Sequence, residues 1–455
     1  VSLTDVKVYS QNGLLLAKLP LVEVYYNWHW QEFSFEKFNF KELAYIERLY
    51  LKDGEFFVRR EDTQFDLMPI LKVQADGQPH GFAGLLELDS AQIDLTRAWN
   101  FNTDIIIEEV DGTINFQNAD KIAIDLTGTF ETAPLAVSGG YSPQNGEIFL
   151  ENKTPVNLTA INFKRLFPAR NETFLQEILL EKVAFAAKPA QTPDAVWEIK
   201  ADGEFSGLTM NEPAQIRAGR GRFALAGPKL IFSGLALEIA GLAANGGGEL
   251  LVNSSDLSAS ELKFAIALPS VDPAKLSAQL VGENPLQLDA AIAGTLKEPT
   301  VTGKFKLPRL DLDNIPVSNI NGEFDYNSAG VFLKAVTGES LGGKITAAGE
   351  LFLDSRTCEL NIAGYGLDSF IILGKDFKGA LDFNAHLSSR AATTITRGNF
   401  IVRDGYAYGA PFQVFNGFFV KQDGKSDITD VAIRTRTGNI YPGALNQEAF
   451  KGSLP

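Results

Sequence analysis

Short runs in which apolar and polar residues alternate are the feature that most restricts the fold of this chain. Residues 122–127 read Ile-Ala-Ile-Asp-Leu-Thr, and similar runs cover 331–335, 350–354, 359–362 and 381–384. Successive side chains of a β-strand point to opposite faces of the sheet, so a period of two is typical of a strand with one buried face. The sequence therefore predicts a chain built mostly from antiparallel strands.

Turn signals between and within these runs support the same prediction. Asn-Gly and Asp-Gly favour type I′ hairpin turns, because both central residues of such a turn need positive φ. We expect hairpins at nine of these dipeptides, namely Asp53-Gly54, Asp76-Gly77, Asp111-Gly112, Asn145-Gly146, Asp202-Gly203, Asn321-Gly322, Asp404-Gly405, Asn416-Gly417 and Asp423-Gly424.

Helical signals are few and brief. Residues 272–276 begin with Asp-Pro, which is typical of an N-cap followed by proline at the first helical position. Residues 171–180 carry leucines and an isoleucine at helical spacing, and residues 39–47 carry a weaker pattern. Strands and helices do not alternate as a parallel α/β sheet requires. We therefore predict an all-β fold with a few short helices.

The length of the chain restricts how these strands can be arranged. At roughly 10 residues per strand and turn, 455 residues could form on the order of 40 strands. One open twisted sheet rarely exceeds about 10 strands without curling or splitting. The chain is therefore expected to form several sandwiches or one long curved sheet.

A loose internal similarity divides the chain. Residues 157–163 and 268–272 share a pattern in which a short polar and apolar segment leads into a helical signal and then strands. We predict three segments, 1–156, 157–267 and 268–455, or alternatively one continuous domain.

The charge excludes several kinds of partner. The chain has 41 Lys and Arg against 56 Asp and Glu, for a net charge of -15. A protein that binds nucleic acid neutralises phosphates with a basic surface, and a polybasic membrane anchor needs clustered cations. We therefore expect no nucleic acid partner and no electrostatic grip on anionic lipid.

Metal and cofactor chemistry also lacks a pattern. Cys358 is the only cysteine, so the chain has no intrachain disulfide and no cysteine-rich zinc site. The three histidines share no ligand spacing. We predict no catalytic, cofactor or metal residues, and no segment carries the roughly 20 apolar residues of a membrane-spanning helix.

One stretch matches catalytic motifs by spacing alone. Residues 338–342 fit G-x-S-x-G, the nucleophile elbow, with Ser340 at its centre, and His386 and several acidic residues follow. Residues 338–344 also fit a phosphate-binding loop, but Ile345 stands where Ser or Thr would bind magnesium. Both motifs need a following helix, whereas residues 343–349 alternate like a strand. We predict a glycine-rich bend and no enzymatic activity.

Phenylalanine is unusually frequent, with 33 Phe against 11 Tyr and 4 Trp. These rings bring a large apolar area and few polar groups. They fill a core or line an apolar trough. From the alternation we predict that the residues facing into such a trough are Ile122, Ile124, Leu126, Val331, Leu333, Ile345, Leu351, Leu353, Leu360, Ile362, Leu381 and Phe383.

Two regions resemble a known family. Residues 294–307, GTLKEPTVTGKFKL, resemble the recurrent G-x-L-x-x-P-x-V/L-x-G-x-L/F-x-L repeat of TamB-like proteins of the AsmA superfamily, the inner-membrane component of the translocation and assembly module. The pattern continues through 320–326 and 341–351. Residues 6–17, 22–25 and 46–56 resemble the opening strands of the same family. Together these regions cover about half of the chain.

The resemblance implies an elongated, curved sheet folded like a taco, with an apolar concave face. It also implies a periplasmic protein that moves phospholipid between the inner and outer membranes. Its implied partners are phospholipid and an outer-membrane barrel-assembly protein of the TamA/BamA type. We expect the chain to be a periplasmic piece whose inner-membrane anchor precedes Val1 in the full-length protein.

A second function is compatible with the same fold. The unpaired edge of a long sheet can accept a strand from another protein by β-augmentation. The alternative is therefore a periplasmic scaffold or chaperone for the assembly of outer-membrane barrel proteins.

Overall fold

The structure of the protein is a computed structural model. It describes residues 1–9, 13–26, 46–59, 84–97, 105–116, 121–142, 144–166, 175–189, 197–211, 215–239, 241–253, 259–272, 285–312, 315–327, 329–352, 357–370, 377–390, 393–407, 409–422 and 425–445.

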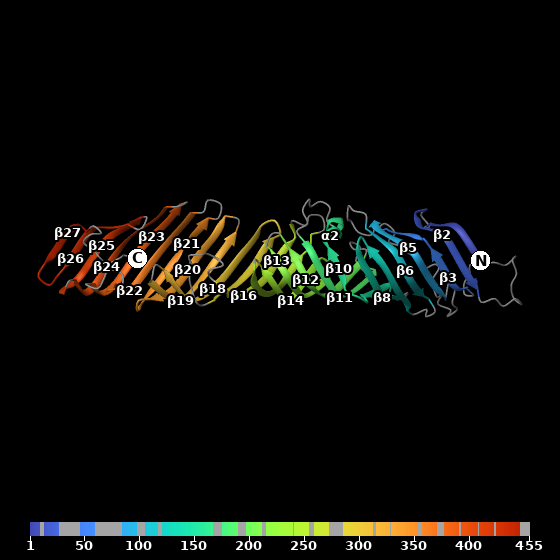
Figure 1. Cartoon of the computed structure of the whole chain (residues 1–455), viewed down its shortest axis with the longest axis horizontal. Coiled ribbons are helices and arrows are strands. Elements are labelled where there is room, and N and C mark those ends of the chain that lie inside the picture. Colours follow the sequence, from blue (N-terminus) through green and yellow to red (C-terminus); the bar gives the residue numbers. More distant parts are fainter. Residues whose placement is uncertain are drawn as a thin grey trace. The chain divides into compact units, whose positions relative to one another are not determined.

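These residues form 27 β-strands and the helix α2, and they divide into two compact units, Val1–Gly241 and Leu242–Pro455. Within each unit the strands lie side by side in a twisted, curved sheet (Figure 1). The prediction of an all-β fold with mainly antiparallel pairing is confirmed. Several of the strands in these ranges are longer than the sequence estimate assumed, and β11 and β24 reach 15 residues.

The described residues of the first unit form fourteen strands and the helix α2. Their bounds are β1 Ser2–Tyr9, β2 Leu15–Tyr26, β3 Ile46–Lys52, β4 Glu55–Arg59, β5 Leu85–Arg97, β6 Ile106–Asn115, β7 Ile122–Phe130, β8 Ala133–Ser142, β9 Glu147–Asn152, β10 Val156–Thr159, α2 Ala160–Leu166, β11 Leu175–Pro189, β12 Trp197–Met210, β13 Ile216–Ala226 and β14 Lys229–Ile239.

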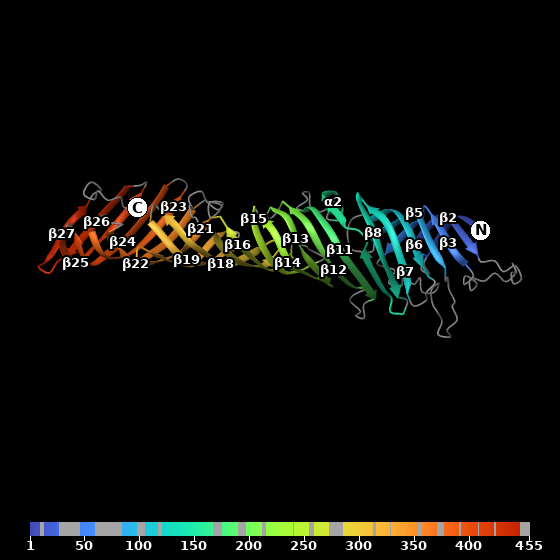
Figure 2. The ribbon, with the colours of Figure 1, turned by 60° about the horizontal axis from the view of Figure 1, so that its bottom comes forward.

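The second unit has thirteen strands in its described part, and each pairs with the next in an antiparallel meander (Figure 2). Their bounds are β15 Leu242–Leu251, β16 Glu261–Val271, β17 Leu286–Thr295, β18 Pro299–Leu312, β19 Ile315–Asn327, β20 Gly330–Ser340, β21 Gly343–Phe352, β22 Thr357–Asp368, β23 Phe377–Arg390, β24 Thr393–Ala407, β25 Ala410–Gln422, β26 Lys425–Arg434 and β27 Asn439–Leu445. The predicted segment boundaries at 156/157 and 267/268 fall inside β10 and β16.

Two short strands of the first unit share one strand position. β3 and β4 both pair with β2 in the antiparallel sense, and both run parallel to β5. Asp53 between them has a φ of 54°. β3 and β4 therefore lie one after the other between β2 and β5, and Asp53-Gly54 separates them without reversing the chain. The prediction of a hairpin at this dipeptide is wrong.

Most of the other dipeptides at which hairpins were predicted lie inside strands. Asn145-Gly146 does lie in the turn between β8 and β9. The dipeptides that lie inside strands, where hairpins were wrongly predicted, are Asp111-Gly112, Asp202-Gly203, Asn321-Gly322, Asp404-Gly405 and Asn416-Gly417. Asp76-Gly77 and Asp423-Gly424 lie outside the described residues.

The physical reason is that a β-bulge uses the same backbone conformation as a turn. Asp404 has a φ of 47° inside β24, and the pairing of β6 with β7 shifts register between Glu108 and Asp111. A residue pair that tolerates positive φ therefore permits a bulge as readily as a hairpin. The pairing with neighbouring strands decides which of the two forms.

The helical predictions fail where strands pair on both sides. Residues 175–180 were predicted as helix but belong to β11, which pairs with β10 and β12. Cross-strand pairing overrides their weak helical periodicity. The helix lies instead at α2, where buried Asn162 accepts a hydrogen bond from the Thr159 backbone N–H at 2.8 Å. Most of the predicted helices at 39–47 and 272–276 lies outside the described residues.

Phenylalanine rings lie over glycines of neighbouring strands. Phe305 of β18 pairs directly with Gly322 of β19, and Phe324 of β19 pairs with Gly303 of β18. A Cβ atom at either glycine would overlap the opposite ring. Glycine and phenylalanine pair in the same way at Phe205–Gly221, Phe223–Gly203, Phe264–Gly248, Phe383–Gly364, Phe400–Gly417, Phe412–Gly405 and Phe419–Gly398.

The sheet of the second unit has one apolar and one polar face. We call the side that carries Ile266, Phe324, Leu333, Ile362 and Phe419 the apolar face, and the opposite side the polar face. Strand pairing fixes both, because residues directly opposite each other on adjacent strands share a face.

The apolar face also carries the core of this unit. Leu367, Leu381, Val402 and Phe415 are successive cross-strand partners on β22 to β25, and each is at most 2% exposed. Phe415 contacts the ring of Phe400 at a centroid distance of 5.2 Å. Apolar side chains of these four strands therefore pack on one another.

Candidate functional site

The structure brings the predicted groove residues of the second unit onto one face. Val331 pairs with Leu351, Ile345 with Gly364, and Ile362 with Ala385 on successive strands. The predicted residues that the pairing places on the apolar face are Val331, Leu333, Ile345, Leu351, Leu360, Ile362, Leu381 and Phe383. Leu353 lies outside the described residues.

These residues differ in how accessible they are. Leu381 is only 2% exposed and belongs to the core cluster of β22 to β26. Most of the others, including Leu333 and Ile362, are half-buried. Leu381 therefore serves packing, whereas the half-buried residues keep apolar area in contact with solvent.

The predicted groove residues of the first unit also share a face. Ile124 pairs with Ile114 of β6 and with Gly139 of β8, and Leu126 pairs with Gly112 and Val137. Ile122 is 4% exposed, so it is a core residue. Leu126 packs against the core cluster of β2 to β6.

One row of directly paired residues crosses nine strands of the apolar face, from β15 to β23. Every member is half-buried, and none carries an acidic or basic side chain. The row consists of Gly246, Ile266, Ala290, Gly303, Phe324, Leu333, Gly349, Leu360 and Leu387. At about 4.8 Å per strand, it forms an uncharged stripe about 38 Å long.

The repeat in residues 294–307 forms the turn between β17 and β18 and most of β18, which contributes Gly303 to this stripe. Gly294, the last residue but one of β17, has a φ of 101° and pairs with Pro299, the first residue of β18. The turn is closed by the backbone N–H of Glu298, which donates to Thr295 Oγ1 at 3.1 Å. The alternating residues that follow, Val301 to Leu307, point to the apolar face.

The polar face carries ion pairs between adjacent strands. Lys304 pairs with Glu323 at 3.0 Å, and His386 Nε2 lies 2.9 Å from Glu359. Asp382 accepts a hydrogen bond from the backbone N–H of Gly366 at 2.7 Å and pairs with Arg403. The Gly366 hydrogen bond, and then Arg403, hold the pKa of the Asp382 carboxyl below its usual value.

Two hollows open on the polar face of the second unit. The first has a volume of about 1050 Å³ and crosses β15 to β20, and the second has about 900 Å³ and crosses β20 to β25. Each is lined by a central row of apolar-face residues and the two flanking rows of polar-face residues.

The identity of the lining residues shows on which face the hollows open. Large apolar-face side chains two positions away, such as Phe305 and Phe383, do not line either hollow. The central row therefore contributes its backbone, and the flanking rows contribute their side chains. Sequence reasoning missed these hollows, because it followed only the apolar half of the alternation.

The first unit has a charged cluster on β2, β3 and β5. The Arg48 guanidinium lies over the rings of Tyr25 and Tyr50 and pairs with Glu87. Tyr50 donates its hydroxyl proton to Asp89, and this hydrogen bond raises the pKa of Tyr50 to about 12. The cluster joins three strands, and no spacing in the sequence pointed to it.

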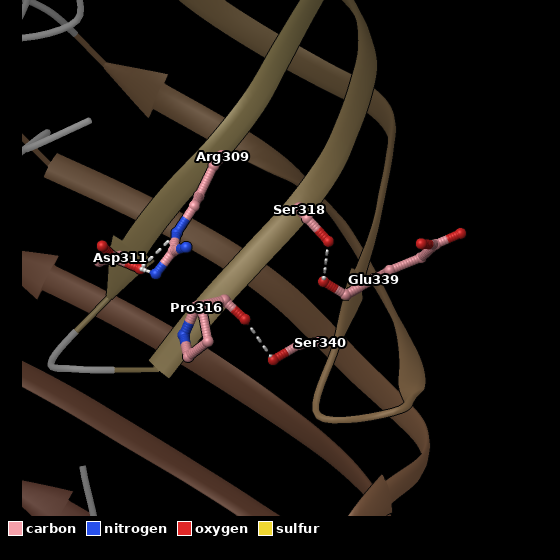
Figure 3. Close-up of polar contacts among 6 residues, drawn as sticks. All are labelled: Arg309, Asp311, Pro316, Ser318, Glu339 and Ser340. Atoms are coloured by element: carbon pink, nitrogen blue, oxygen red, sulfur yellow. Dashed lines mark hydrogen bonds and ion pairs between the residues drawn. The ribbon is translucent and has the colours of Figure 1, made fainter. Parts of the chain in front are cut away.

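Ser340 has a structural partner. Its hydroxyl donates to the backbone oxygen of Pro316 at 2.8 Å, and the side chain of Ser318 donates to the backbone oxygen of Glu339 at 3.3 Å (Figure 3). Ser340 is 4% exposed at the end of β20, before the Leu341-Gly342 turn. His386 lies against Asn361 and Glu359.

Neither a metal-binding cluster nor a membrane-spanning helix occurs among the described residues. Among them, no three His, Cys, Asp or Glu side chains gather closely enough to hold a metal ion. Within the same ranges, no helix has the length and apolar character needed to cross a membrane.

Comparison with protein-family models, with curated proteins and with solved structures finds no match for this chain. The similarity to TamB-like proteins therefore rests on the sequence motifs alone and stays a prediction.

Proposed function

We propose that this protein is a non-enzymatic lipid conduit that carries phospholipid acyl chains along the apolar face of its sheet. The observation that carries the proposal is the uncharged, half-buried stripe across β15 to β23. A stripe of this kind offers apolar area to a ligand without a polar or charged group to obstruct it.

The energetics of acyl chains match such a surface. Each CH₂ group removed from water contributes roughly 0.8 kcal/mol, so two acyl chains can be held without a charge contact. The head group would stay in water, which is consistent with the excess of 56 Asp and Glu over 41 Lys and Arg in this chain. Similar affinity along the stripe would let a chain slide, whereas one deep pocket would trap it.

The proposed location follows from the family resemblance. The protein would act in the periplasm, attached to the inner membrane in its full-length form. It would deliver phospholipid toward the outer membrane with a barrel-assembly partner of the TamA/BamA type. This part of the proposal rests on the motif in residues 294–307 and its continuation.

The first experiment is mass spectrometry of an organic extract of the protein, purified without detergent. We expect stoichiometric phospholipid. Val301→Asp and Leu333→Asp place a charge on the apolar face and should remove most of it. Thr300→Asp is the matched control, because Thr300 precedes Val301 and points to the exposed polar face.

Circular dichroism and thermal unfolding establish that each variant is folded. Equal lipid in Val301→Asp, Leu333→Asp and Thr300→Asp would contradict a conduit on the apolar face. A folded, lipid-free parent protein that binds an unfolded barrel strand would instead support the periplasmic scaffold or chaperone.

A further inference from the structure

The second hollow of the polar face has a chemistry that lipid binding does not use. We call it the asparagine hollow, after Asn361, Asn384 and Asn399, which line it on β22, β23 and β24. It crosses six strands, β20 to β25. Five spacings of about 4.8 Å give it a length of roughly 24 Å, which suits an extended ligand better than a compact one.

Amide groups stand beside one another in this hollow. Asn384 and Asn399 are direct cross-strand partners, so their Cβ atoms lie roughly 5 Å apart. Within the described part of the chain, neither side chain has a hydrogen-bond partner, whereas Asn361 Oδ1 lies 3.0 Å from His386 Nδ1 and accepts a hydrogen bond when that nitrogen carries the proton. Each free amide offers one acceptor oxygen and two donor hydrogens.

An apolar platform adjoins the amides. Phe418 is the direct partner of Asn399 on β25, and its side chain is 53% exposed. Val420, two residues further along the same strand and face, is 37% exposed. An aromatic ring left in solvent beside unpaired amides offers a ligand both an apolar contact and hydrogen bonds.

Ligand charge is limited by the surroundings. Arg397 is the cation of the hollow without an ion-pair partner among the described residues, and Glu359 already pairs with His386 beside it. The whole chain carries a net charge of -15. A polyanion would meet one free cation and a repelling background, so the balance favours an uncharged ligand.

We propose that the asparagine hollow binds a neutral glycan chain. Sugar rings present hydroxyl groups that both donate and accept hydrogen bonds, as amides do, and they present apolar C–H faces that pack on aromatic rings. An oligosaccharide lying across β22 to β25 would place its hydroxyls at the Asn384–Asn399 pair and one ring on Phe418. This site lies on the face opposite the apolar stripe and does not depend on lipid binding.

The test is isothermal titration of the full chain with cellohexaose, maltohexaose and chitohexaose, and with dextran sulfate as the anionic comparison. We expect saturable binding of at least one neutral hexasaccharide. Phe418→Ala should weaken it about tenfold or more, which corresponds to roughly 1.4 kcal/mol. The double variant Asn384→Ala/Asn399→Ala should weaken it by a similar factor, and Phe418→Trp should retain it.

Tyr365→Ala is the matched control. Tyr365 is an aromatic residue of the polar face on β22, 51% exposed and outside the lining of the hollow. The proposal is overturned if no neutral oligosaccharide binds saturably. It is also overturned if Phe418→Ala and Tyr365→Ala lose binding equally, or if only dextran sulfate binds and Arg397→Ala abolishes that binding. Thermal unfolding of each variant establishes that it is folded, and the asparagine variants test the site independently of Phe418.

Discussion

The ring of Phe305 occupies the space that a side chain at Gly322 would fill. The two residues are direct partners on β18 and β19, and the reciprocal pair, Phe324 and Gly303, lies two residues away on the same strands. Each strand thus places one phenylalanine ring over a glycine of the other strand. This exchange holds the two strands in register and covers the backbone at both glycines.

The first prediction concerns this exchange. Gly322→Ala should destabilise the protein by roughly 1–3 kcal/mol, because the new methyl group overlaps the Phe305 ring and forces it out of its position. Denaturant unfolding measures the change. In a Phe305→Leu background the same substitution should cost clearly less. An equal cost in both backgrounds would show that the ring is not what the methyl group meets.

The second prediction compares two phenylalanines of one strand. Phe415 is 1% exposed and contacts Phe377, Phe400 and Phe412, so Phe415→Ala should cost roughly 3–5 kcal/mol through the cavity that it leaves. Phe418→Ala removes an exposed ring and should stay within about 0.5 kcal/mol. Thermal and urea unfolding of both variants test the difference, and similar losses would contradict the assignment of the faces.

The third prediction concerns Ser340. Ser340→Ala leaves the half-buried backbone oxygen of Pro316 without this donor, so it should cost roughly 0.5–1.5 kcal/mol in unfolding free energy. Hydrolysis of model esters should be no different in this variant and the parent. Ester cleavage by the parent that Ser340→Ala abolishes would show instead that the serine is a nucleophile.

The fourth prediction concerns acid stability. The pKa of Asp382 is lowered in the folded protein, chiefly by the Gly366 backbone hydrogen bond, so this carboxylate stabilises the fold above its ordinary pKa of 3.8. That contribution is lost as the pH falls through the lowered value. Asp382→Asn should therefore destabilise by about 1 kcal/mol or less at pH 7.

Urea unfolding at pH 7 and at progressively lower pH distinguishes the two proteins. The difference between parent and Asp382→Asn should shrink as the pH falls below 3.8 and the parent carboxyl becomes protonated. A difference that does not change with pH would show that charge on Asp382 is not involved.

One sequence pattern indicates part of the strand pairing. On three pairs of neighbouring strands, each strand carries one G-x-F triplet. The triplets begin at Gly203 and Gly221, at Gly303 and Gly322, and at Gly398 and Gly417. In each case the glycine of one triplet pairs with the phenylalanine of the other. These triplets, spaced 18 or 19 residues apart, indicate both the hairpin and its register.

Bulges and some strands could not be predicted from the sequence, because they depend on pairing with residues distant in sequence. The Asp404-Gly405 dipeptide suits a turn and a bulge equally, and its position opposite β23 and β25 makes it a bulge. Residues 175–180 carry a helical pattern, and pairing with β10 and β12 makes them a strand.

The alternation alone determined the class of fold and which side chains share a face, because the two-residue period of a strand is a local property of the backbone. It predicted that Leu333 and Ile362 lie on one side, and strand pairing puts both on the apolar face. Only the tertiary structure decided that Leu381 is core while those two remain half-buried, since burial depends on how the sheet curves. It also decided that Asn384, Asn399 and Phe418 meet in one hollow, because strand register, and not sequence distance, brings them together.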